Sequence, residues 1–311
     1  MIKIDLITGF LGSGKTTFIK MYARFLMSQG LRVGILSNDY GAVNVDTMLL
    51  KELRGDNCEL ESVAGGCDSD CHSRRFKTKL IAMAMSGYDR VIIEPSGVFD
   101  VDEFFDTIHD EPLDRWYEEG SVITIVDSML EDNMSSESDY YLASQAACAG
   151  VILMSRSQLA SASQIDDSIN HLLRAAEGVK LRRDLSPIIN RSNWFNFTDD
   201  DFRAIMNSGH RSSSYVKLMN RDIAGFETMY FLDKPMGIDT FQDKLNTLFG
   251  DSRYGEAFRV KGFVLEDGAW KQINATPRAT QVADIDEGQQ VFIVIGRDLN
   301  KEAITQLFED L

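Results

Sequence analysis

The stretch that decides the fold is residues 8–17, which read Thr8-Gly9-Phe10-Leu11-Gly12-Ser13-Gly14-Lys15-Thr16-Thr17. It satisfies the pattern G-x-x-x-x-G-K-[ST] and lies between a β-branched run, Ile2–Thr8, and an amphipathic stretch, Lys15–Ser28. Glycine lets the backbone turn so that successive N–H groups point inward as an anion nest at a helix start. The motif therefore predicts a phosphate-binding loop, whereas the plainer alternative is a glycine turn before a surface helix.

In this interpretation each residue type of the loop has a chemical role. Lys15 is expected to reach the β- and γ-phosphates of a nucleotide, and the Thr16 hydroxyl is expected to ligate Mg²⁺. The predicted nucleotide-binding residues of the loop are Gly9, Gly12, Ser13, Gly14, Lys15, Thr16 and Thr17.

Outward from the loop, short β-branched runs alternate with amphipathic stretches, the pattern of βα units around a parallel sheet. The predicted strands are Ile2–Thr8, Arg32–Ser37, Arg90–Glu94, Val122–Asp127, Val151–Met154 and Pro187–Asn190. The predicted helices are Lys15–Ser28, Arg74–Ser86, Val101–His109, Ser138–Ala149, Ile165–Ala176 and Asp199–Asn207. We therefore predict an α/β P-loop domain with a mostly parallel sheet flanked by helices.

The texture of the sequence changes after a polar, aperiodic stretch at 210–214, which is typical of a linker. Strands are predicted at Thr228–Leu232, Phe258–Leu265, Ala269–Asn274 and Gln290–Ile295, and helices at Thr240–Phe249 and Lys301–Leu311. This order fits a small α+β domain with an antiparallel sheet. The predicted domains are therefore residues 1–215, which bind nucleotide, and residues 216–311.

Composition limits the classes of partner. The 311 residues are 44% hydrophobic, which favours two domains, and 32 lysines and arginines against 48 acids give a net charge of −16. That balance argues against binding nucleic acid or an anionic membrane, since both require clustered positive charge. No apolar run approaches the roughly 20 residues that span a bilayer, and an acid, Asp5, stands where a signal peptide is apolar. We expect a cytoplasmic protein whose four cysteines are free thiols or metal ligands.

An acid beside the loop is needed to complete a Mg²⁺ site, because Mg²⁺ prefers oxygen ligands. Glu94 ends an apolar run, and Gly97 follows three residues later, so that its N–H is expected to approach the γ-phosphate. Asp39, in Asn38-Asp39-Tyr40-Gly41, is the next candidate for a direct or water-bridged contact. The alternatives are a solvated strand end at Glu94 and a capping aspartate at Asp39.

These motifs together resemble the CobW-like GTPases, which are related to the urease and hydrogenase accessory GTPases. The resemblance is carried by the loop, by Asn38-Asp39-Tyr40-Gly41, by Glu94-Pro95-Ser96-Gly97 and by Val122–Asp127. In the second domain, Arg259–Phe263 and Ile295–Leu299 resemble the C-terminal module of the family. The resemblance implies that GTP binding and hydrolysis gate the delivery of a metal ion to a client metalloprotein. It also implies that Lys15, Thr16, Asp39, Glu94 and Gly97 are the catalytic residues.

The metal motif departs from the family pattern. Family members carry Cys-x-Cys-Cys after a glycine, whereas this chain reads Gly65-Gly66-Cys67-Asp68-Ser69-Asp70-Cys71-His72. Cys67, Cys71 and His72 are a candidate ligand set for Zn²⁺ or another transition metal, with a carboxylate or water as the fourth ligand. The alternative is a pair of thiols in a switch segment that has lost its metal role.

The base-reading motif departs as well. Related GTPases read guanine with Asn-Lys-x-Asp, whereas the run Val151–Met154 is followed here by Ser155-Arg156-Ser157-Gln158. Arg156 is expected to cover the base plane, but Gln158 supplies an amide in place of a carboxylate, and losing a paired acceptor weakens discrimination. GTP is favoured by the resemblance, with ATP or relaxed specificity as the alternative.

The expected activity is slow nucleoside triphosphate hydrolysis, because the sequence has no evident glutamine or arginine finger. The expected partners are a client metalloprotein and a second copy in a nucleotide-dependent homodimer. Two other functions stay open: a P-loop small-molecule kinase, and a nucleotide-gated assembly or reactivation module for a metalloenzyme or corrinoid protein. Cys58 is only a minor candidate for an extra metal ligand, and three isolated histidines, at positions 109, 171 and 210, are expected to have surface or capping roles.

Overall fold

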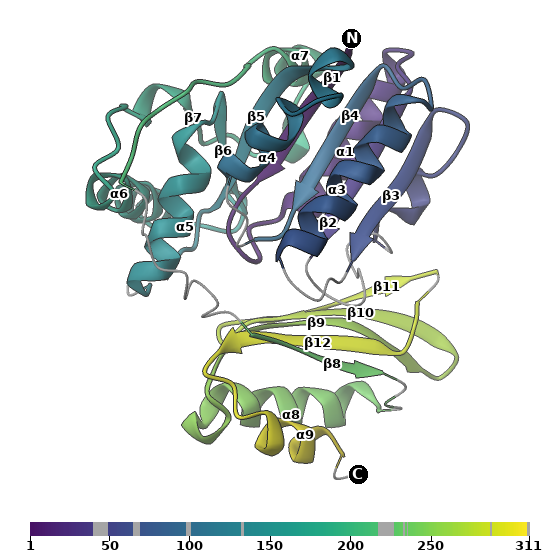
Figure 1. Ribbon diagram of the computed structural model, residues 1–311. Helices are drawn as coiled ribbons and strands as arrows, with labels where there is room; N and C mark the ends of the chain where they lie inside the picture. Colours follow the sequence, from purple (N-terminus) through teal and green to yellow (C-terminus); the bar gives the residue numbers. More distant parts are fainter. Residues whose placement is uncertain are drawn as a thin grey trace. The chain divides into compact units, whose positions relative to one another are not determined.

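Strand β1 (Ile2–Thr8) and helix α1 (Lys15–Ser28) lie on either side of the glycine loop, with the bounds that the sequence predicts (Figure 1). The computed structural model describes residues 1–39, 49–64, 69–97, 101–131, 134–216, 227–232, 234, 236–286 and 288–309, without the side chains of Asp39, Ala64 and residues 69–72. Its contacts divide the chain into two units. The described residues up to 216 belong to the first and those from 227 onward to the second.

The first unit is built on a parallel sheet. Its other strands are β2 (Val33–Asp39), β3 (Cys58–Ala64), β4 (Arg90–Pro95), β5 (Tyr117–Asp127), β6 (Val151–Ser155) and β7 (Ile189–Asn190). The seven strands lie in the order β3-β2-β4-β1-β5-β6-β7, and every described pair is parallel. β1 is therefore central, and the loop that follows it opens at the carboxyl edge of the sheet between β4 and β5. This arrangement confirms the predicted α/β class.

Helices cover both faces of this sheet and bury two apolar clusters. The helices that follow α1 are α3 (Ser69–Ala84), α4 (Val101–Ile108), α5 (Ser136–Ala147), α6 (Ala162–Gly178) and α7 (Asp199–Met206). Residues of α1 and α7, such as Phe18 and Phe202, pack on one face, and residues of α3 and α4, such as Phe76 and Phe104, pack on the other (Figure 1). Because both faces of β4 are buried, its residues Val91, Ile92 and Ile93 form a continuous apolar run, whereas β1, which is buried from Ile4 onward, carries Asp5 among its apolar residues.

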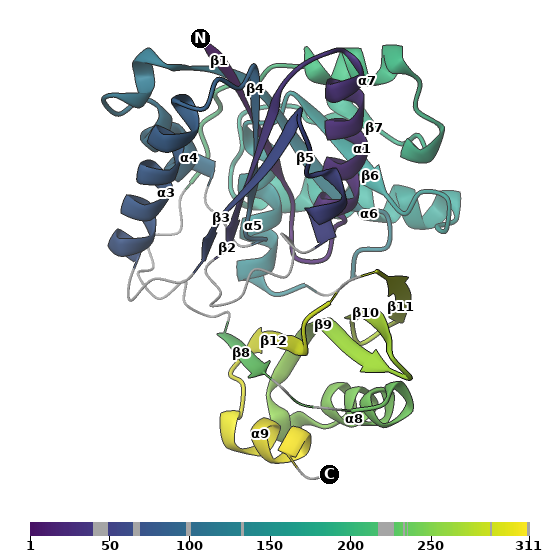
Figure 2. The same cartoon turned by 90° about the vertical axis from the view of Figure 1, so that its right-hand side faces the viewer.

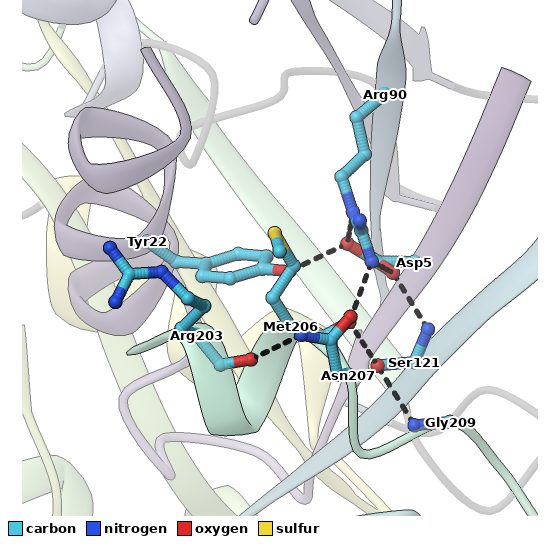
Figure 3. A network of polar contacts seen from close by, with 8 residues as sticks. All are labelled: Asp5, Tyr22, Arg90, Ser121, Arg203, Met206, Asn207 and Gly209. Atoms are coloured by element: carbon cyan, nitrogen blue, oxygen red, sulfur yellow. Dashed lines mark hydrogen bonds and ion pairs between the residues drawn. The ribbon is translucent and has the colours of Figure 1, made fainter. Parts of the chain in front are cut away.

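A buried ion pair joins the two central strands (Figure 3). Asp5 on β1 is fully buried and accepts hydrogen bonds from both the Nε and the Nη2 of Arg90 on β4. Its carboxylate also accepts from the Tyr22 hydroxyl on α1 at 2.9 Å and from the backbone N–H of Ser121 at 2.7 Å. Ser121 lies at an irregularity in the pairing of β1 with β5. Ile4 lies opposite Glu119 while Leu6 lies opposite Val122, so β5 has one extra residue here, as in a β-bulge. The carboxylate is thus held by three elements.

The same network reaches the end of α7. Arg90 Nη2 and the Ser121 hydroxyl both donate to the carbonyl of Met206 at 2.9 Å, and Gly209 N–H donates to the Ser121 hydroxyl (Figure 3). Burial lowers the pKa of the Arg90 guanidinium, but its hydrogen bonds and charge attraction to Asp5, together with its interactions with Tyr22, outweigh this and raise the pKa overall. The arginine is therefore charged. It donates a hydrogen bond to the carbonyl of Met206, which has no donor within the helix because it lies at the helix end.

The second unit is a small α+β structure. Its strands are β8 (Glu227–Leu232), β9 (Glu256–Glu266), β10 (Ala269–Ala275), β11 (Thr280–Ile285) and β12 (Val291–Arg297). They form an antiparallel sheet in the order β11-β10-β9-β12-β8. Helices α8 (Ile238–Gly250) and α9 (Lys301–Glu309) cover one face of it (Figure 2), where Phe241, Phe292 and Phe308 form the centre of the core.

The predicted α+β class of this part is confirmed, although β11 was not predicted. The expected boundary between residues 215 and 216 stays a prediction, because residues 217–226 lie outside the described ones.

One histidine corrects the sequence analysis. His171 was expected at a surface or capping position, but it is only 6% exposed inside α6, and its Nε2 lies 2.7 Å from the Asp139 carboxylate on α5. The helix turns this side chain toward α5 together with its buried neighbour Leu172. A polar group on a buried helix face needs a partner from another element, and Asp139 supplies it.

Candidate nucleotide site

The glycine loop adopts a backbone that side chains would obstruct. Gly9, Gly12 and Gly14 have φ angles of +147°, +78° and +99°. A Cβ on Gly9 would lie 2.3 Å from the carbonyl oxygen of Ile125 on β5. The loop ends at the first residue of α1, and no acidic residue lies in the first turn of that helix. The loop therefore presents its backbone beside the positive end of a helix dipole, as an anion site requires.

Three predicted site residues meet at this loop. The Lys15 ammonium is buried and donates to the carbonyl of Gly9 at 2.8 Å, so it lies folded over the loop. The Thr16 hydroxyl donates to Glu94 Oε1 at 2.5 Å, and Glu94 is 2% exposed near the end of β4. A hydroxyl and a carboxylate in contact at the edge of an anion nest form a set of hard oxygen ligands that suits Mg²⁺. The residues present therefore fit the predicted ion.

Gly97 lies against the loop as well. A Cβ on Gly97 would be 2.7 Å from the backbone nitrogen of Leu11 and 2.8 Å from its Cα, so only glycine allows this approach. On its other side, the Gly97 carbonyl accepts a hydrogen bond from the side-chain amide of Gln145 at 2.9 Å. The turn after β4 is thus packed between the loop and helix α5.

The predicted base-reading segment follows β6. Ser155 is buried at the end of the strand, whereas Gln158 is exposed. The Arg156 guanidinium makes an ion pair with Asp127 at the end of β5, and its Nη2 donates to the carbonyl of Gly12 at 3.2 Å. Arg156 thereby ties this segment to the phosphate loop. The role of Ser155, Arg156 and Gln158 in reading a base stays a prediction.

Buried polar atoms around the loop lack partners among the described residues. They are the hydroxyls of Thr8, Ser13 and Ser155 and both amide atoms of Asn38. A buried polar group without a hydrogen bond is costly, and such groups gather where a ligand or water completes them. Thr8, Ser13, Asn38 and Ser155 all lie at the carboxyl ends of the central strands or in the loop itself. This supports a polar ligand at the carboxyl edge of the sheet.

The predicted metal segment is described only in part. Cys67 lies outside the described residues, and Cys71 and His72 lie in α3, where their side chains are not described. The side chain of Asp39, at the end of β2, is likewise not described. Among the side chains that the structure does describe, no group of three histidine, cysteine, aspartate or glutamate residues suits a metal. The candidate set of Cys67, Cys71 and His72 therefore stays a prediction.

Cys58 makes a poor additional ligand. The thiol is buried at the start of β3, and burial together with the nearby Glu59 raises its pKa to about 11. Metals bind the thiolate, which such a pKa makes rare at neutral pH. The buried position of Cys58 on β3 fits a packed side chain better than a ligand.

Comparison with known families identifies the relationship of the first unit. A family model described as "CobW/HypB/UreG, nucleotide-binding domain" matches residues 3–181, which is more than half of the 311 residues. The chain belongs to the CobW/HypB/UreG family. Its fold is accordingly that of a P-loop NTPase, and the resemblance inferred from the sequence motifs is confirmed.

Two curated relatives in this family come from Escherichia coli (strain K12), and each is 28% identical to the chain. The zinc chaperone YeiR matches over 158 residues, 50% of this chain and 47% of YeiR, and the zinc chaperone YjiA matches over 174 residues, 52% of each. The matched region thus spans about half the length of each of these relatives.

A solved structure of Zn(II)-bound YjiA GTPase from E. coli covers 99% of this chain and 98% of its own, with 17% identity and a TM-score of 0.37. The strand order of the parallel sheet and the family model together assign the fold. Within the described ranges, no helix has the length and apolar character needed to cross a bilayer.

Three residues near the loop were not assigned a role from the sequence. Asp127 and Gln145 act through contacts that cross 29 and 48 residues of chain. Trp194 follows β7, and its indole N–H donates to the carbonyl of Met154 at 2.7 Å. Its ring would touch a Cβ on Gly14 at 3.5 Å and meets Phe18 edge to face. Trp194 therefore joins the start of α1 to the end of β6.

This position predicts an optical signal. We expect nucleotide binding to change the fluorescence of Trp194, because an anion in the loop alters the field at the adjacent Gly14. Emission is measured while GTP and Mg²⁺ are titrated into the wild type and into Trp194→Phe, with binding followed independently by equilibrium dialysis. The variant should bind nucleotide but lose most of the change. An undiminished change would assign the signal to Trp116 or Trp270 instead.

Proposed function

We propose that this chain is a nucleotide-dependent metallochaperone or metallocofactor-maturation factor that hydrolyses a nucleoside triphosphate, with GTP favoured over ATP. The observation that carries the proposal is the contact of the Thr16 hydroxyl with the buried Glu94 carboxylate, 2.5 Å apart, beside a glycine loop that ends in Lys15. Family membership supports the same conclusion. The whole-protein activity and the client are part of the proposal, since the relatives match over about half their length.

The residues of the site divide the chemistry of phosphoryl transfer between them. Loop N–H groups and Lys15 bind the phosphates and stabilise the negative charge that develops on them. The Lys15 ammonium has three N–H donors, so it can bind the phosphates while one of them still donates to the carbonyl of Gly9. Thr16 and Glu94 would hold Mg²⁺, which neutralises charge on the β- and γ-phosphates when bound. Asp39 and Gly97 are proposed to respond to the γ-phosphate.

The preference for GTP is tested by competition. GTP, ATP and their diphosphates are titrated against a fluorescent nucleotide analogue on the full chain with Mg²⁺. We expect GTP to bind more tightly than ATP, by a smaller factor than a carboxylate at position 158 would give. Gln158 offers the two N–H donors of the guanine edge only one acceptor oxygen, whereas a carboxylate offers two. Gln158→Asp should therefore increase the preference for GTP. Tighter binding of ATP by the wild type would overturn the guanine assignment.

The metal proposal concerns the cargo. The relatives YeiR and YjiA are zinc chaperones by name, and in this chain Cys67, Cys71 and His72 are proposed to hold Zn²⁺ or another transition metal in transit. Affinities for Zn²⁺, Co²⁺ and Ni²⁺ are measured on the wild type and on Cys67→Ser/Cys71→Ser, with Cys148→Ser as a matched control for loss of a thiol. Equal affinities would contradict the site. Absence of metal after anaerobic purification without chelator, with nucleotide-dependent binding of a client, would favour the assembly module.

A further inference from the structure

The turn that carries Gly97 is fixed from a second side by a residue that the phosphate-loop motifs do not include. Gln145 lies in the last turn of α5 and is fully buried. Its side-chain nitrogen donates to the carbonyl of Gly97 at 2.9 Å, and its side-chain oxygen has no partner among the described residues. Among the described residues, this carboxamide makes one hydrogen bond, and that bond goes to Gly97.

A buried carboxamide at this place is costly for the fold. Its neighbours Ala143, Ala146 and Ala147 on α5 are all buried, so an apolar side chain would suit the same position. Burying an amide with only one of its two polar ends satisfied costs free energy that an apolar side chain of similar size avoids. The one hydrogen bond that this buried amide is described to make goes to the turn beside the phosphate loop, which indicates that the position of Gly97 matters.

The backbone of Gln145 is itself anchored to the sheet. The Thr124 hydroxyl on β5 donates to the Gln145 carbonyl at 2.8 Å, and Thr124 lies opposite Thr8, the last residue of β1. Gly97 therefore has contacts on two sides that both lead back to β1. On one side it packs against the backbone of Leu11 in the loop that follows β1, and on the other it is bonded to Gln145, which Thr124 links to the strand next to β1. These two contacts position the turn after β4 relative to the loop.

We propose that Gln145 is a positioning residue for the hydrolysis reaction, holding Gly97 where its backbone N–H meets the γ-phosphate. This inference rests on the proposed function, since it needs a triphosphate in the loop. Gln145 itself touches neither phosphate nor Mg²⁺ and acts only through the Gly97 carbonyl. Its effect is therefore confined to ligands that have a γ-phosphate. A diphosphate bound in the loop does not reach Gly97 and is insensitive to residue 145.

The test separates these two ligand classes. Gln145→Met keeps the length and helix propensity of the side chain and removes the donor. We expect kcat for GTP hydrolysis to fall about tenfold, the size of one lost hydrogen bond, while the Kd for GDP stays within twofold of the wild type. Gln145→Leu should behave in the same way and guards against a fault specific to methionine. Ser144→Ala removes a neighbouring buried hydroxyl, which donates to Tyr141 O within α5, and should alter neither quantity.

Each outcome decides whether Gln145 has a positioning role. If kcat and GDP affinity are both unchanged in Gln145→Met, or fall by the same factor, Gln145 has no positioning role. Measurements on the wild type show whether a negative result contradicts only this inference or the proposed function as well. If it binds GTP and hydrolyses it while the variants match it, only this inference fails, whereas a wild type that does not bind nucleotide overturns both.

Discussion

Lys15→Ala is expected to lower the rate of GTP hydrolysis by at least about 100-fold, a loss typical of removing one preorganised charge-stabilising donor. Lys15 is the one side chain of the loop whose positive charge can follow the charge that develops on the transferred phosphoryl group. Its ammonium lies 2.8 Å from the carbonyl of Gly9, so it is already within the loop, and its three N–H donors can be shared between that carbonyl and a phosphate. Phosphate release measured under saturating GTP and Mg²⁺ gives the rate.

The substitution should leave the fold intact. Lys15 is the first residue of α1, and alanine is the best helix former. Removing a buried ammonium also removes the cost of its desolvation. Thermal unfolding of Lys15→Ala checks this, and Lys20→Ala is a matched control. Lys20 lies on the same helix and pairs with Glu52 near the surface. Hydrolysis by Lys15→Ala at the wild-type rate would show that the glycine loop is not the site of the chemistry.

The part of the site that sequence could predict is the part that is contiguous. Glycine spacing and the Lys-Thr pair place the loop and both flanking elements, so β1 and α1 were predicted to the residue. Glu94 followed from the position of an acid in a buried run. Gln145 and Asp127 did not follow, because their partners are a backbone carbonyl and an arginine that the fold brings in from distant segments.

One strand that the sequence missed has little burial. Strand β11 lies at the edge of the second sheet, and the side chains from Thr280 to Asp284 are all exposed, so no apolar alternation marks it. His171 failed for the opposite reason. The amphipathic pattern of α6 gives no sign that a polar residue faces another helix, and the partner, Asp139, lies 32 residues away. Pairing between elements decides both cases, and periodicity within one element does not encode it.

Arg90→Met is expected to destabilise the first unit by about 3–5 kcal/mol, because removing one partner of a buried pair leaves the other charge uncompensated. Asp5 would keep the Tyr22 hydroxyl and the Ser121 N–H, but the carbonyl of Met206 would lose its guanidinium donor. At roughly 2–4 °C per kcal/mol for a unit of this size, the midpoint of thermal unfolding should fall by about 6–20 °C. Calorimetry or circular dichroism measures it.

A double-mutant cycle distinguishes a lost ion pair from lost packing. Asp5→Asn alone should also destabilise strongly, whereas Asp5→Asn/Arg90→Met should lose much less than the sum of the two single changes, because no uncompensated charge is left buried. Lys3→Met, on the same strand as Asp5, removes an exposed ion pair with Glu118 on β5 and should change the midpoint little. Simple additivity of the two single changes would mean that Asp5 and Arg90 do not stabilise each other. In that case the backbone hydrogen bonds and apolar contacts of β1 and β4 would hold these central strands together without help from the ion pair.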